Sequence, residues 1–148
     1  MPDTSTQASL LAYQIGLRSW LDSQGVAAQV ESIALQGRWD LGETGLLEFT
    51  ERTFTWYRYA TDLDGDAYQG SFTLTPGALT NSGFILDHGE DAPIYSVFLH
   101  YTNDRVGGSD HDADRWGLFT VEFSGPDEVY IRNHTTNSHL HGVRMGSD

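Results

Sequence analysis

The chain contains no cysteine and no lysine, and all eight of its basic residues are arginines. The lack of thiols excludes a disulfide framework, cysteine-based catalysis and thiolate metal sites. The sequence also lacks a long apolar run, and its first six residues carry no basic side chain. We therefore expect neither a signal peptide nor a membrane span. Together these absences predict a soluble, cytoplasmic protein.

Positive charge is scarce, because twenty-one carboxylates outweigh the arginines and give a formal net charge of -13. Such a surface repels phosphate backbones and anionic lipids, so we expect no binding to nucleic acid and none to membranes. The carboxylates gather in segments 62–66 and 110–114, a distribution typical of solvated loops. A length of 148 residues fits one domain with its own core.

Residues 6–24 show the periodicity of an amphipathic helix. Its apolar positions are Leu10, Leu11, Ile15, Leu17, Trp20 and Leu21. Gly25 lies where a left-handed residue would end such a helix. Because so short a helix is unstable alone in water, its apolar stripe must pack on the rest of the domain or, as an open alternative, on a partner.

From about Val30 the apolar residues recur with period two, as half-buried strands require. After a first strand ending near Leu41, we predict strands over 46–50, 53–61, 67–75, 78–86, 94–102, 116–123, 128–133 and 138–145, with a long loop over 103–115. Eight or nine short strands in sequence order predict an antiparallel up-and-down β-barrel, since closure removes exposed edges. The chain is then a single domain over 1–148, with the helix at 6–24 and the barrel at 30–145.

The alternation also separates the two faces of the strands. The predicted inward residues are Tyr68, Phe72, Leu74, Tyr95, Val97, Leu99, Tyr101, Phe119, Val121, Phe123, Val129 and Ile131. The outer face still carries four large apolar side chains, Ile94, Phe98, Trp116 and Leu118. This is too much apolar surface to leave in water, so we predict that the N-terminal helix covers it.

The triplet Gly37-Arg38-Trp39 opens the first predicted strand. In this respect the chain resembles the calycin superfamily, which includes the lipocalins and the avidin-like proteins. The resemblance implies a lipocalin-like barrel in which Gly37 and Trp39 are structural, Trp39 plugs the closed end, and Arg132 or Arg144 stacks on it. The chain departs from the secreted lipocalins in lacking cysteines and in placing its helix before the first strand.

A barrel of eight strands has room for its own side chains or for one small ligand. The aromatic interior is the first candidate site, with Trp56, Tyr68, Tyr95, Tyr101 and Phe119 as ligand-binding residues and Arg58 at the mouth. Rings with a polar edge offer broad contact and an oriented donor, although ordinary core packing is the other interpretation. Either Arg58 enters the cavity as an anchor for a carboxylate or phosphate, or its face turns outward and leaves Tyr57 and Tyr59 inside.

Two patterns have the composition of metal sites. Residues 62–66 copy the start of an EF-hand loop, but Ala67 replaces the glycine of the sharp turn, so we interpret this segment as a hairpin turn. His134, His139 and His141 have a spacing that can ligate zinc, but near a chain end we expect exposed histidines without a metal. We predict no metal site and no cofactor.

No catalytic motif occurs in the sequence. We therefore predict a non-enzymatic protein that binds a small hydrophobic or aromatic molecule inside the barrel. An isomerase, cyclase or hydratase remains an alternative, since such enzymes need few polar groups in an apolar cavity. A second alternative is an interaction protein with a side-chain-filled barrel, whose helix or acidic face engages a partner or a second copy in a homodimer.

Overall fold

The computed structural model describes residues 4–27, 34–59, 62, 64–80, 83–86, 93–134 and 136–145. The chain begins with the helix α1 (Thr4–Ser23) and continues almost entirely as strands. The remaining elements are β1 (Gly37–Asp40), the short 3-10 helix η2 (Gly42–Thr44), β2 (Leu46–Phe49), β3 (Thr53–Tyr57), β4 (Ala67–Pro76), β5 (Ala78–Thr80), β6 (Gly83–Ile85), β7 (Ile94–Val106), β8 (Ser109–Gly125), β9 (Glu128–Asn133) and β10 (Ser138–Arg144). Among the described helices, none has the length and apolar character needed to cross a membrane.

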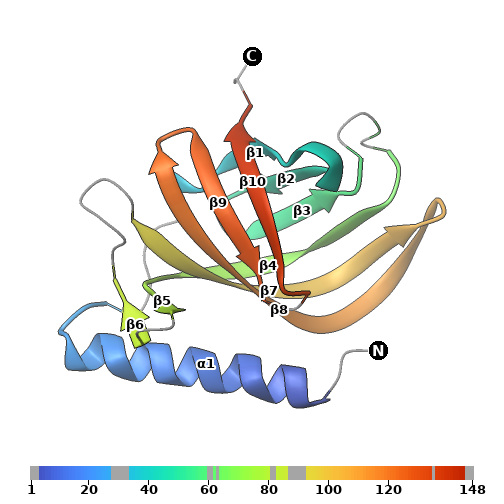
Figure 1. Ribbon diagram of the computed structural model, residues 1–148. Coiled ribbons are helices and arrows are strands. Elements are labelled where there is room, and N and C mark those ends of the chain that lie inside the picture. Colours follow the sequence, from blue (N-terminus) through green and yellow to red (C-terminus); the bar gives the residue numbers. More distant parts are fainter. Residues whose placement is uncertain are drawn as a thin grey trace.

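Eight strands close into an antiparallel barrel in the order β1-β10-β9-β8-β7-β4-β3-β2 (Figure 1). Strands that follow one another in sequence are neighbours in the barrel, except that β5 and β6 pair only with each other. The last strand closes the ring by pairing with the first, which sets Trp39 opposite Arg144. The predicted fold class, a mainly β up-and-down barrel with an N-terminal helix on its outside, is confirmed.

Helix α1 lies along the outer face of the barrel (Figure 1). Leu10, Leu17 and Leu21 are buried against Phe98 of β7 and Leu118 of β8. These contacts remove from water the apolar surface that two barrel strands would otherwise expose. The amphipathic pattern of the helix therefore has its partner within the same chain.

Trp116 is an exception to the predicted cover of the outer patch. Its side chain is 47% exposed, and its ring stacks on His100 with the centroids 4.3 Å apart. The His100–Trp116 pair lies farther along β7 and β8 than the Phe98–Leu118 pair that α1 covers. The expectation that α1 buries Trp116 is thus wrong.

The predicted strand over 78–86 is also wrong as a barrel strand, because it folds as the separate β5–β6 hairpin. Gly77 precedes this hairpin with a φ of +89°, a conformation that side chains rarely adopt. Phe84 of β6 packs against α1, with its ring centroid 5.9 Å from those of Tyr13 and Trp20. The hairpin therefore buries its apolar side chain under the helix.

The predicted loop over 103–115 is instead the tip of a long hairpin. β7 and β8 continue to Val106 and Ser109, and Gly107 and Gly108 form the turn with φ values of +63° and +80°. A two-residue hairpin turn of this kind needs positive φ at both positions, which glycine accepts without strain. The tip extends beyond the barrel (Figure 1), so its strands lack a buried face and an apolar alternation.

The closed end of the barrel, where β1 begins, is filled by Trp39. This residue is fully buried, and its indole N–H donates to the carbonyl of Leu35 at 2.9 Å. The guanidinium carbon of Arg144 lies 4.2 Å from the Trp39 ring centroid. Arg144 also donates to the carbonyls of Gln36 at 2.6 Å and Ala34 at 2.8 Å. Of the two candidate arginines, the structure places Arg144 on the plug.

Two glycines make room for this arrangement. Gly37 has a φ of +118°, and a Cβ at this position would lie 3.0 Å from the guanidinium of Arg144. A Cβ at Gly142 would lie 2.9 Å from Val129 and 3.2 Å from Leu41. Larger residues at either position would therefore displace the packing around the plug.

Candidate functional site: the open end of the barrel

The middle of the barrel is occupied by its own aromatic side chains. Trp56 of β3 meets Phe119 of β8 edge to face, with the ring centroids 5.7 Å apart. Trp39 of β1 meets Phe123 of β8 in the same way at 6.0 Å. In the barrel order two strands separate β3 from β8 and β1 from β8, so both contacts span the interior. These rings therefore fill the middle of the interior.

The end of the barrel opposite Trp39, which we call the open end, is where β1 and β3 finish and β4 begins. Trp56 and Tyr68 face each other there across β3 and β4, with their ring centroids 6.3 Å apart. The indole N–H of Trp56 donates to the carbonyl of Thr44 in η2 at 2.9 Å. Tyr101 of β7 is 9% exposed, and its ring packs edge to face on Phe54 at 5.1 Å. These rings form an apolar floor with polar edges.

Arg115 of β8 lies over this floor. Its guanidinium carbon is 4.4 Å from the ring centroid of Tyr101 and 5.8 Å from that of Tyr68. The same guanidinium donates two hydrogen bonds to the carboxylate of Asp104, at 2.6 and 2.9 Å. This is the bidentate geometry in which arginine recognises a carboxylate. The carboxylate of Asp104 is thus held by an arginine that also stacks on an aromatic ring.

A second arginine, Arg58, stands at the rim. It follows the last residue of β3, is exposed, and has its guanidinium carbon 5.5 Å from the ring centroid of Tyr59. The phenols of Tyr59 and then Tyr68 raise the pKa of Arg58. Within the described part of the chain, Arg58 forms no ion pair with a carboxylate. It is therefore a cation at the mouth and does not enter the interior.

Tyr101 defines the proton chemistry of the open end. Burial raises the pKa of its phenol to about 12, with smaller opposing and supporting effects from Arg115 and Asp104. The phenol therefore stays protonated over the physiological range. An efficient general base has a pKa near the working pH, so this group suits hydrogen bonding better than proton abstraction.

The structure brings together most of the aromatic residues proposed from the sequence. Trp56, Tyr68, Tyr101 and Phe119 converge near the open end, and Arg58 lies on its rim. It does not bring Tyr95 to them. The Tyr95 ring contacts Phe123 at 5.9 Å, and Phe123 in turn contacts the plug at the closed end.

Sequence reasoning missed Arg115 and Asp104. Both fall in segment 103–115, which we predicted as a loop. Alternate residues of a strand share one face, and Arg115 lies four residues before Phe119. A strand that begins at or before Arg115 therefore places both side chains on the inward face. The missed signal was the Gly107-Gly108 turn, which marks a hairpin.

The histidines proposed as metal ligands have separate partners. His134 bonds the hydroxyl of Thr120 at 2.9 Å, and His141 bonds the carboxylate of Glu128 at 2.9 Å. His139 projects from the outer face of β10 opposite Arg132. In the described residues, no cluster of three histidine or carboxylate side chains has the arrangement of a metal site.

Comparisons with protein-family models, curated proteins and solved structures yield no match to this chain. The closed eight-stranded barrel and its single helix are compatible with a calycin-like architecture. Any functional conclusion must therefore come from the geometry of the barrel itself.

Proposed function

We propose that this protein is a non-enzymatic, calycin-like binding protein that holds a small, flat aromatic ligand carrying one anionic group at the open end of its barrel. The ligand's ring stacks on the floor formed by Trp56, Tyr68 and Tyr101, and its anionic group pairs with Arg115 or Arg58. The observation that carries this proposal is the guanidinium of Arg115, held over Tyr101 and engaged with the carboxylate of Asp104.

Charge supports this choice of ligand. In a chain with a net charge of -13, Arg58 and Arg115 lie beside the same ring, that of Tyr68. Asp104 balances the charge of Arg115, so Arg58 supplies the excess positive charge that attracts an anion. Asp104 occupies one guanidinium edge, but it is a side chain that can rotate away and leave its place to a ligand carboxylate. A neutral apolar ligand would use the rings and leave both cations without a role.

Binding is favoured over catalysis by the ionisable groups at the same end. The raised pKa of Tyr101 removes it as a base near neutral pH, and Arg115 and Asp104 already neutralise each other. The enzyme alternative would require a group that titrates near the working pH within reach of the aromatic floor.

Isothermal titration with 2-naphthoate tests the proposal. We expect saturable binding, with Kd raised about tenfold or more by Arg115→Gln and by Arg58→Gln, as loss of a charge-assisted hydrogen bond gives. Arg52→Gln, at an exposed position in the turn between β2 and β3, is the matched control and should leave Kd unchanged. Binding that is insensitive to Arg115 and Arg58 would contradict the proposal.

A second candidate is an interaction protein whose barrel serves only as a scaffold. The cross-barrel contact of Trp56 with Phe119 supports it, because these rings already fill the interior. Native mass spectrometry of protein purified from its own host separates the two candidates. A bound mass that is released on denaturation supports ligand binding, whereas a clean unliganded mass together with no response to 2-naphthoate supports the scaffold.

A further inference from the structure

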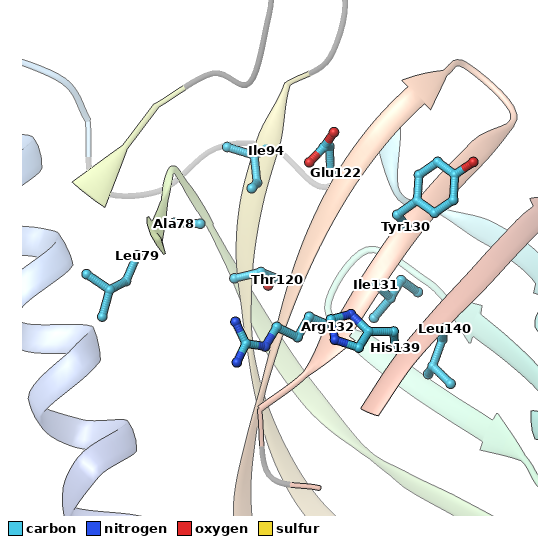
Figure 2. Close-up of a pocket in the computed structure, with 10 residues that line it drawn as sticks. All are labelled: Ala78, Leu79, Ile94, Thr120, Glu122, Tyr130, Ile131, Arg132, His139 and Leu140. Carbon is cyan, nitrogen blue, oxygen red and sulfur yellow. The ribbon is translucent and has the colours of Figure 1, made fainter. Parts of the chain in front are cut away.

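A groove runs along the outer face of the barrel (Figure 2). The outer faces of β8, β9 and β10 form its floor, and Ala78 and Leu79 of β5 form one wall. Its volume is about 310 Å³, at the lower limit of the roughly 300–1,000 Å³ typical of ligand pockets. The groove exists because β5 and β6 leave the barrel and pack under α1 instead.

The polar side chains of the floor lie in rows set by the strand register. One row runs from Thr120 on β8 through Arg132 on β9 to His139 on β10. The next row places Glu122 opposite Tyr130. Figure 2 shows the guanidinium of Arg132 directed toward Leu79, beside Thr120, with Glu122 and Tyr130 at the other end of the groove. The groove therefore has a basic end and an acidic end.

Arg132, like Arg58, has no carboxylate partner among the described residues. Arg38, Arg115 and Arg144 each pair with a carboxylate. Arg132 instead donates to the amide oxygen of Asn137 at 3.1 Å, and it forms no ion pair with any described residue. In a chain with 21 carboxylates and eight basic residues, an arginine that lines a groove without a carboxylate retains its capacity to bind an anion.

His134 lies next to the basic end of the groove, and the charge of Arg132 affects its pKa. Burial, followed by the charges of Arg132 and then His139, lowers the pKa of His134 to about 4. Its ring bonds the hydroxyl of Thr120, one of the groove residues. His134 therefore stays neutral near neutral pH, and the basic end depends on Arg132 and His139.

We propose that this groove is a second binding site, for a small aliphatic monocarboxylate. The carboxylate is held by Arg132, with Thr120 and His139 as further donors, and the aliphatic part lies against Leu79, Ala78 and Ile94. Apolar side chains on the walls, together with a guanidinium that has no carboxylate partner among the described residues, match one anionic head on a short apolar body. The site shares no residue with the open end, so it does not depend on the function proposed there.

Glu122 limits the charge of the ligand. Its carboxylate lines the same groove, two residues along β8 from Thr120. A ligand with two or more negative charges would meet repulsion from Glu122 as well as attraction to Arg132. The groove should therefore prefer a monocarboxylate to inorganic phosphate.

Titration of ¹⁵N-labelled protein by NMR tests this site with butyrate as the probe. We expect saturable shifts of the Arg132 side-chain Nε–H and of the Thr120 and Leu79 amides, with Kd raised about tenfold or more by Arg132→Gln. Leu79→Glu keeps Arg132 but sets a carboxylate on the facing wall, and should weaken binding independently. Arg52→Gln is again the matched control. Glu122→Gln should strengthen phosphate binding more than butyrate binding, because the repulsion that it removes scales with the charge of the ligand.

Shifts in wild-type protein that do not saturate, or that persist unchanged in Arg132→Gln, would overturn the proposal. A stronger response to phosphate than to butyrate would overturn the claim of monocarboxylate preference. The resonances also separate this site from the open end. Butyrate shifts confined to Trp56, Tyr68 and Tyr101 would refute the groove while leaving the function of the open end standing.

Discussion

Both ends of the barrel stack an arginine on an aromatic ring, but they satisfy that arginine in different ways. At the closed end Arg144 lies 4.2 Å from the Trp39 centroid, and at the open end Arg115 lies 4.4 Å from the Tyr101 centroid. Arg144 donates to the backbone carbonyls of Gln36 and Ala34. Arg144 also donates to the carboxylate of Asp127 at 3.0 Å, whereas Arg115 donates to the carboxylate of Asp104. The stacking is nearly the same, and the partners of the remaining N–H groups differ.

An arginine stacked on an aromatic ring can therefore contribute either to stability or to recognition, depending on its other partners. Backbone carbonyls are fixed by the fold and cannot leave, so Arg144 ties the segment before β1 to the end of β10. Asp104 is a side chain, so under the proposed function Arg115 exchanges it for the carboxylate of a ligand. We expect the closed end to contribute mainly stability and the open end mainly recognition.

The largest effect should come from Trp39→Ala. Deleting this fully buried ring leaves a cavity beside Phe123 and removes the surface on which Arg144 stacks, so the free energy of unfolding should fall by about 3–5 kcal/mol. Urea unfolding followed by circular dichroism measures this loss. Trp116→Ala, at a half-exposed position, is the control and should cost about 1 kcal/mol or less. Equal losses in the two variants would show that Trp39 is not a plug.

A smaller loss in the free energy of unfolding should distinguish Arg144 from Arg132, the two arginines that the sequence offered as partners of Trp39. Arg144→Met removes hydrogen bonds to two backbone carbonyls and a stacked cation, so we expect a loss of about 2–3 kcal/mol in unfolding free energy. Arg132→Met, at an exposed outward position on β9, should stay within about 0.5 kcal/mol. The same urea assay compares them. A reversed order would remove the distinction between the closed end and the outer groove.

The choice between Arg132 and Arg144 shows what the sequence did not contain. The triplet at Gly37 and the alternation of apolar residues were enough for the barrel, for the outside position of the helix and for most inward faces. Which arginine reaches Trp39 depends on how β10 closes on β1, and that register joins residues more than one hundred positions apart. No local pattern encodes such a pairing.

The missed hairpin tip has a different cause. Alternation is visible only where one strand face is buried, and residues 106–112 are exposed on both faces. Their aspartates therefore had the composition of a loop, although the backbone continues as paired strands. As a result, Arg115 and Asp104, the two residues that give the open end its anion geometry, were left out of the sequence-based site.

The last prediction concerns the pH dependence of stability that Tyr101 contributes. The pKa of Tyr101 is about 12 in the folded protein because of burial, against about 10 for an unfolded tyrosine. Between these values the native state binds more protons than the unfolded state, so stability falls as pH rises from 10 to 12. In Tyr101→Phe, the free energy of unfolding measured with urea should fall by about 1–2 kcal/mol less than in the wild type over that pH range. Tyr95→Phe, at the closed end, is the matched control and should retain it. If Tyr95→Phe and Tyr101→Phe behaved alike, the two ends would not differ in their proton chemistry, and the burial of the open-end phenol under Arg115 would have no energetic consequence.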